Sequence, residues 1–174
     1  MKRSKKIAAA LTSLTTIVAT TFATISAAPA HAADSNTSVP PEITMPGSPD
    51  GIPSAGNGPI KLFIYPASVY ALAHPGTNPQ GANNFSCKPR EGQNPVVLLP
   101  GTNFDAYASW SMYAPKLTKL GYCVFSPNFN GLKLLPNFAY TGDIRVSAKA
   151  VSGFVDRVLT ATGSKKVDLI GWSQ

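Results

Sequence analysis

The residue types best suited to chemistry stand at the end of the sequence. Gly171, Trp172, Ser173 and Gln174 follow the mainly apolar run 167–170. A glycine, any residue and then a serine, directly after a buried strand, form most of a G-x-S-x-G nucleophile elbow. That turn would present the Ser173 hydroxyl to a general base and direct the Gln174 N–H toward a developing oxyanion. The pattern predicts a serine nucleophile, with an accidental tetrapeptide near a turn as the alternative.

The elements that would position Ser173 alternate between strands and helices. The pattern predicts strands over 96–99, 122–125 and 166–170, and helices over 109–120 and 143–160. This alternation predicts an α/β fold with a parallel sheet, whose active site lies at the carboxyl ends of the strands. Because the loops 100–103 and 171–174 both follow such ends, we expect them to meet at one site.

Finer features of these elements can also be predicted. Pro115 falls inside the helix over 109–120, so its first half could be a separate turn. Before the first core strand, 61–65 could form a short strand and 66–72 one or two helical turns. The buried face of the helix over 143–160 is expected to contain Ile144, Ala148, Val151, Val155, Val158 and Leu159.

Three segments divide the chain. Residues 1–32 resemble a secretory signal peptide, with a basic start, an Ala- and Thr-rich apolar stretch and the A-x-A site Ala30-His31-Ala32. A membrane anchor is the weaker alternative, because Thr and Ser interrupt the apolar run. Residues 33–60 are rich in Pro, Gly and Ser and predict an extended linker, and 61–174 form the candidate domain. We expect a protein that is secreted or associated with the cell envelope, without a stable membrane span.

Charge and cysteine content narrow the possible partners. The net charge is +7, but four of the fifteen Lys and Arg lie within the first six residues, and the other eleven face eight Asp and Glu. No basic block remains to bind nucleic acid. Cys87 and Cys123 both lie in the exported part, where a pair favours a disulfide over free thiols. Neither a metal site nor a cofactor site is predicted, since ligand spacing is lacking.

The motifs together resemble a known family, the secreted actinobacterial class 2 lipases of the α/β-hydrolase type. The resemblance covers about 60–174, the front half of such a lipase, and rests on PVVLLPGT, LGYCVF, FVD and KVDLIGWSQ, together with NFSCKP around Cys87. Most relatives have His-Gly where this chain has Pro100-Gly101, and Trp172 fills a position that often holds His. In both departures the chain is similar to the Candida-type lipase B.

The resemblance implies an α/β-hydrolase fold, and hydrolysis of acylglycerol-type esters through a serine acyl-enzyme in lipid catabolism. Ser173 matches the nucleophile, while Thr102 and Gln174 match the two oxyanion donors. Lipid or ester substrates are the expected partners of a monomeric enzyme.

The acid and base of the triad are not among the residues that match the family. In α/β-hydrolases they follow the serine, whereas His31 and His74 both precede it. We therefore expect the 174-residue chain to be a front half, truncated at the elbow and inactive by itself. A cutinase-like esterase, a mycolyl transferase and a non-catalytic remnant of a lipase gene remain alternatives.

Overall fold

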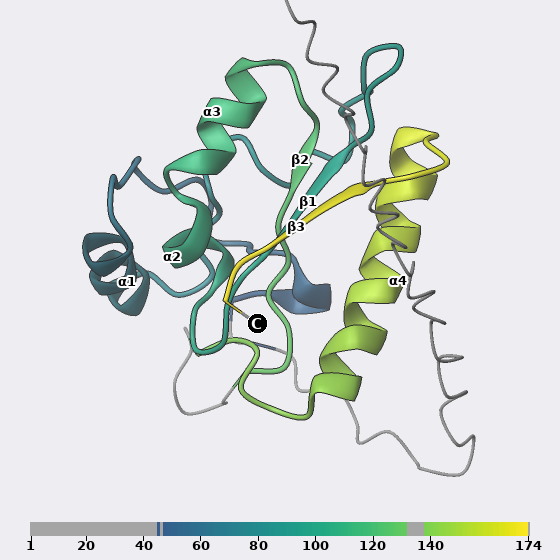
Figure 1. Cartoon of the computed structure of the whole chain (residues 1–174). Coiled ribbons are helices and arrows are strands. Elements are labelled where there is room, and N and C mark those ends of the chain that lie inside the picture. Colours follow the sequence, from purple (N-terminus) through teal and green to yellow (C-terminus); the bar gives the residue numbers. More distant parts are fainter. Residues whose placement is uncertain (1–44, 46, 132–137, 174) are drawn as a thin grey trace, which may run out of the picture. The chain divides into compact units, whose positions relative to one another are not determined.

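The fold is built on three parallel strands. The computed structural model describes residues 45, 47–131 and 138–173. Its sheet has the order β2-β1-β3, from β1 (Val96–Leu99), β2 (Val124–Phe125) and β3 (Asp168–Gly171) (Figure 1). Both neighbours run parallel to β1, as the alternation of strands and helices predicts. The α/β character and the parallel sheet of the prediction are confirmed.

Helices cover both faces of this sheet. Val96 and Leu98 of β1 pack with the helices α2 (Ala106–Trp110) and α3 (Tyr113–Lys119), and Val97 packs on the other face with α4 (Ile144–Thr162) (Figure 1). Alternate residues of a strand point to opposite faces, so a strand covered on both sides is apolar throughout. This is why the run 96–99 has no polar residue.

Two predicted elements near the amino end of the domain differ from the structure. The expected strand over 61–65 is wrong, because α1 (Ile64–Ala73) already begins at Ile64. Pro66 stands in its first turn, where a missing N–H costs no helical hydrogen bond. The expected helix over 109–120 is two helices, α2 and α3, and α2 starts earlier because Asp105 caps it.

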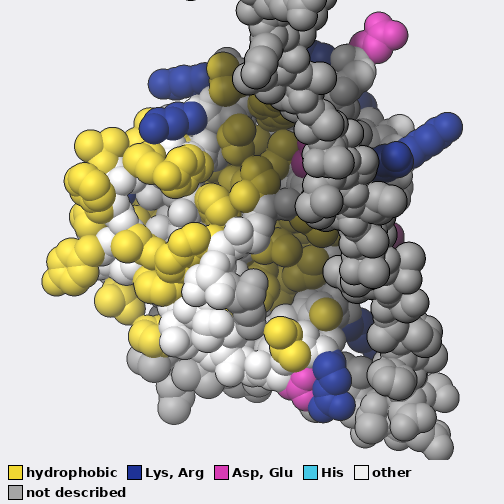
Figure 2. Space-filling model, in the orientation of Figure 1, with side chains coloured by type: hydrophobic (Ala, Val, Ile, Leu, Met, Phe, Trp, Pro, Cys, Tyr) yellow, Lys and Arg dark blue, Asp and Glu magenta, His cyan; other side chains and the backbone are white. Residues whose placement is uncertain are grey.

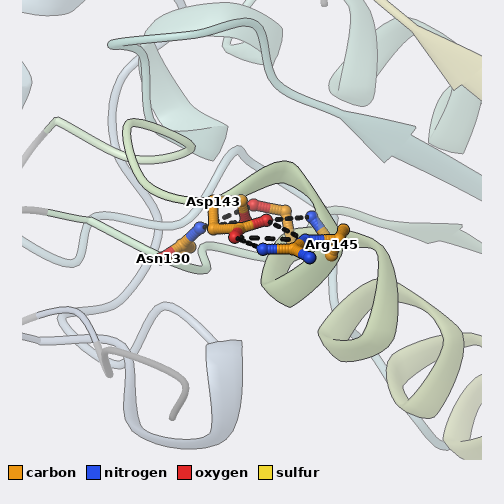
Figure 3. A network of polar contacts seen from close by, with 4 residues as sticks. Asn130, Asp143 and Arg145 are labelled. Atoms are coloured by element: carbon orange, nitrogen blue, oxygen red, sulfur yellow. Dashed lines mark hydrogen bonds and ion pairs between the residues drawn. The ribbon is translucent and has the colours of Figure 1, made fainter. Parts of the chain in front are cut away.

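A buried asparagine fixes the start of α4. Asn130 donates from Nδ2 to the Asp143 carbonyl and to Ser147 Oγ, both at 2.9 Å (Figure 3). Asp143 caps the helix by accepting from the Arg145 N–H at 2.8 Å, and its carboxylate pairs with the Arg145 guanidinium at 2.6 Å. Gly163, with φ of 75°, ends α4 as expected.

The buried face of α4 agrees with the prediction at Val158, but Val146 and Phe154, which are also buried, were not expected there. Val146, Phe154 and Val158 enter the core, whereas Ile144 is 62% exposed. The predicted stripe at Ile144, Ala148, Val151 and Val155 instead lines an open groove against β3. All four residues of β3 are exposed, with Leu169 at 55%, because β3 forms an edge of the described sheet.

The opposite edge, at β2, is covered by a loop. Asn83 donates its backbone N–H to the Val124 carbonyl, and its side-chain amide bonds both the N–H and the carbonyl of Ser126. A disulfide joins Cys87 of the same loop to Cys123, the residue just before β2, which confirms the predicted pair. Peptide-like hydrogen bonds and a covalent link therefore occupy this edge, which would otherwise be free to pair with another strand.

Part of the Pro-rich segment 33–60 packs on the domain. Met45 is 2% exposed and belongs to the core cluster with Phe129 and Phe154. Tyr107 of α2 donates its hydroxyl to the Pro59 carbonyl at 2.5 Å. The predicted signal peptide over 1–32 lies outside the described residues. No helix of the described segments has the length and apolar character to cross a membrane.

Candidate functional site

Two loops leave the sheet at the same level and meet there. In the parallel pair, Leu99 of β1 lies opposite Gly171 of β3, so both strands end together. The Trp172 N–H donates to the Leu99 carbonyl at 3.3 Å, which extends the pairing by one residue. Pro100–Asn103 and Trp172–Ser173 are therefore neighbours at the carboxyl edge of the sheet. This is the meeting of loops that the sequence predicts.

Ser173 adopts a backbone conformation that is uncommon for serine. Its φ is 67°, in the left-handed region. Among the described residues other than glycine, Asp and Asn account for four of the six with positive φ, and the exceptions are Tyr140 and Ser173. Asn and Asp tolerate this region, while other residues with a Cβ pay a steric cost there. A serine in this conformation two residues after a parallel strand is compatible with the nucleophile elbow that the sequence predicts.

Gly101 lets the loop after β1 approach that serine. A Cβ built on Gly101 would stand 2.8 Å from Ser173 Cβ and 2.5 Å from Trp172 Cε3. Distances below about 3.0 Å are closer than such carbon contacts allow. Only a residue without a side chain can stand here with the elbow in its observed place.

Thr102 lies at the tip of the same loop and is exposed. The loop is held by the Phe104 N–H, which donates to Gly101, and by the Asn103 N–H, which donates to the Ala139 carbonyl at 3.0 Å. Asn103, with φ of 68°, supplies the left-handed residue of the turn. Within the described residues, the Thr102 N–H has no acceptor. Gln174, the other predicted oxyanion donor, lies outside the described residues.

A buried carboxyl anchors the loop at its far end. Asp105 is fully buried, caps α2 and accepts from the Ala108 N–H at 2.7 Å. Burial raises the pKa of this carboxyl to about 7, although hydrogen bonds from the Ala108 and Tyr107 N–H groups act in the opposite direction. Beside it, Asn128 accepts from the Ala106 N–H at 2.6 Å and donates to Ser48. These contacts fix the start of α2 and therefore the path of the loop Pro100–Phe104, which leads into that helix.

Two apolar grooves adjoin the elbow, and Trp172 lines both. One, of about 490 Å³, lies between α4 and β3 and includes Gly171. The other, of about 590 Å³, lies between the segment 61–64 and the residues 108–113 of α2 and α3. Trp172 is held edge-on against Phe104, with ring centroids 5.2 Å apart. Ser173 therefore stands where two surfaces able to receive apolar chains come together.

His74, Asp143 and Asp168 make contacts that support the fold. His74 ends α1 and stacks on Tyr70, with ring centroids 4.3 Å apart. Asp143 caps α4, and Asp168 at the start of β3 accepts from Asn94 at 2.9 Å. Arg145 holds the pKa of Asp143 at about 2 through its hydrogen bonds. Within the described residues, no three His, Cys, Asp or Glu side chains could hold a metal ion.

Sequence reasoning missed the supports of the site. Asp105 and Asn128 are not among the candidate residues that the sequence predicts, although an Asp just before a short helical run is a typical N-cap. In the loop between β2 and α4, Phe129 is 4% exposed and packs on Phe154, whereas Tyr140 lines the groove between α4 and β3. Comparison with protein-family models and with curated proteins gives no match for this chain.

Proposed function

We propose that the chain carries the nucleophile and the oxyanion loop of a secreted serine ester hydrolase of the α/β-hydrolase type, acting on lipid esters. The observation that carries the proposal is Ser173 itself, which stands at φ of 67° two residues after a parallel strand with Gly101 packed against it. A structural serine has no need of this strain, whereas a nucleophile gains an exposed hydroxyl from it.

In this proposal Ser173 Oγ attacks the ester carbonyl carbon and passes its proton to a general base. The N–H groups of Thr102 and Gln174 receive the oxyanion, a contribution of about 3–4 kcal/mol for each donor in such sites. The alcohol leaves with a proton, and water then releases the acid from Ser173. His74 is not assigned as the base, because it ends α1 against Tyr70.

The grooves support ester substrates with apolar chains. The groove between α4 and β3 is lined mainly by aliphatic side chains and leads to Gly171 and Trp172, next to the nucleophile. An acyl chain seated there would bring its carbonyl to the carboxyl edge of the sheet. Lipases, esterases and acyltransferases share this acyl-enzyme chemistry, and the acceptor distinguishes them.

The test is ester hydrolysis by the protein expressed from its complete reading frame. The Ser173→Ala variant should lose hydrolysis of p-nitrophenyl esters by a factor of about 10⁴ or more. Ser86→Ala is the matched control, since Ser86 is an exposed serine that lines neither groove. Equal loss in both variants, or full activity in Ser173→Ala, would overturn the proposal.

A further inference from the structure

In helix α1 the small side chains are buried and most of the large apolar side chains are exposed, the opposite of what is usual. Its small residues Ala67 and Ala71 are fully buried, and its bulky residues point outward. The exposed group continues into the segment before the helix, and we call it the α1 surface. Its members are Ile60 at 43%, Leu62 at 63%, Phe63 at 74%, Ile64 at 37%, Tyr65 at 78%, Val69 at 51% and Leu72 at 54% exposed.

A surface of this kind needs an explanation. A helix that is apolar on every side is normally covered, and contiguous exposed apolar patches mark interaction sites. Figure 2 shows hydrophobic side chains gathered on the side of the molecule where Figure 1 places α1. Scattered surface leucines require no cause, but seven large apolar residues within thirteen positions do.

The charges around the α1 surface have one sign. Between Gly51 and Arg90, and again between Ala106 and Gly142, the sequence has no Asp or Glu. Lys61 lies over the ring of Tyr70 at 5.4 Å, and Lys116 of α3 lies over Tyr113 at 5.8 Å. An anionic lipid surface matches both the large apolar area and the lysines beside it.

The α1 surface is continuous with the candidate site. The 590 Å³ groove begins at Lys61–Ile64 and ends at Trp172, beside Ser173. A smaller hollow of about 170 Å³ joins Leu72 to Asn103 and Phe104 of the oxyanion loop. A membrane that covered α1 would therefore contact the mouth of both hollows.

We propose that the α1 surface docks the protein on an anionic lipid surface, with the side chains of α1 in the apolar layer and Lys61 and Lys116 at the headgroups. Aromatic residues such as Tyr65 and Phe63 suit the boundary between the two layers. This docking goes beyond the proposed hydrolysis, since it is a binding property of α1 that does not require reaction at Ser173. If Ser173 is the nucleophile, docking also delivers ester substrate to it.

The experiment is co-sedimentation of the protein from its complete reading frame with phosphatidylcholine vesicles, with and without phosphatidylglycerol. The test variant is Tyr65→Gln with Val69→Gln, both outward on α1 and outside the grooves. The control is Leu120→Gln, an equally exposed residue at the end of α3 that lies outside the α1 surface and lines neither groove. We expect the double variant to lose vesicle binding by about tenfold or more and the control to retain it.

Charge is tested separately. Lys61→Gln with Lys116→Gln should reduce binding to anionic vesicles and leave the weaker binding to neutral ones unchanged. Unchanged sedimentation of the α1 variant, or α1-dependent self-association without vesicle binding, would overturn the docking. Hydrolysis of water-soluble p-nitrophenyl acetate distinguishes the two proposals. Hydrolysis that is retained while vesicle binding is lost supports both, and vesicle binding without Ser173-dependent hydrolysis refutes the proposed function alone.

Discussion

At the scale of single residues, the site depends on a close approach between two loops. Gly101 has no room for a side chain, because its Cβ would meet Trp172 and Ser173. We expect Gly101→Ala to shift the elbow and to lower ester hydrolysis about 100-fold, since an error of about 1 Å in position has that effect. Overpacking should also cost about 1–3 kcal/mol of the free energy of unfolding. Steady-state kinetics and urea unfolding measure the two effects.

Gly153→Ala is the matched control for that change. Gly153 lies within α4, and nothing stands within 4 Å of an added Cβ. Alanine should raise the free energy of unfolding by about 0.5–1 kcal/mol and leave kcat/KM unchanged. If Gly101→Ala behaved like Gly153→Ala, the two loops would not be in contact at the working site.

The buried carboxyl of Asp105 should make the free energy of unfolding depend on pH. Its folded pKa of about 7 is above the ordinary value of 3.8, so the folded state retains a proton that the unfolded state releases. The stabilising contribution is therefore complete below about pH 4 and is lost as pH rises to about 7, by roughly 4 kcal/mol. Asp105→Asn keeps a capping side chain and should remove most of this slope in urea unfolding between pH 4 and 8.

Asp156→Asn serves as the control for the pH series, because Asp156 is an exposed carboxylate on α4. Its slope should match that of the unsubstituted protein. A slope that persisted in Asp105→Asn would contradict the assignment of the buried proton to Asp105.

At the scale of elements, the sequence predicts those helices, strands and links that depend on local sequence patterns. The three strands, the capped and glycine-terminated α4 and the Cys87–Cys123 pair follow from apolar runs, caps and context. The run 61–65 has strand-like composition, but Pro66 favours a helix start there. The predicted buried face of α4 is correct only in part, at Val158, because Phe154 and Val146 also enter the core while the regular stripe from Ile144 lines a groove. Periodicity alone does not distinguish two apolar faces of one helix.

For the candidate site too, the sequence predicts some residues and not others. Ser173 and the loop at Thr102 could be selected because strand ends and small residues are visible in sequence. The anchors Asp105 and Asn128 could not be ranked, since their importance comes from burial and from partners far along the chain. The contact between the side chain of residue 128 and the N–H of residue 106 forms only in the tertiary structure, and no local sequence pattern predicts it.

The disulfide belongs to the element scale because it closes the β2 edge. It joins residues 36 positions apart, and a loop of that length predicts roughly 3–4 kcal/mol of stabilisation. Replacement of both Cys87 and Cys123 by alanine should lower the free energy of unfolding by that amount in urea. The reduced form of the unsubstituted protein should match the double variant. Equal stability of the oxidised protein and the variant would contradict a structural role.

At the scale of the whole molecule, one edge of the described sheet is covered and the other is exposed. The loop of Asn83 and the disulfide cover β2, while β3 exposes Leu169 and leads to Ser173. Helices cover both sheet faces, and α1 adds an apolar surface with basic neighbours. The covered edge at β2 is therefore separate from the part of the molecule around β3 and α1, where the proposed chemistry and lipid contact occur.

The central claim is that Ser173 is a nucleophile, and covalent labelling tests it most directly. The protein from its complete reading frame would be treated with an alkyl fluorophosphonate, and the adduct located by peptide mass spectrometry. We predict one adduct, on Ser173, with no labelling of the Ser173→Ala variant. An adduct on another serine, or ester hydrolysis that continues while Ser173 stays unmodified, would contradict the account.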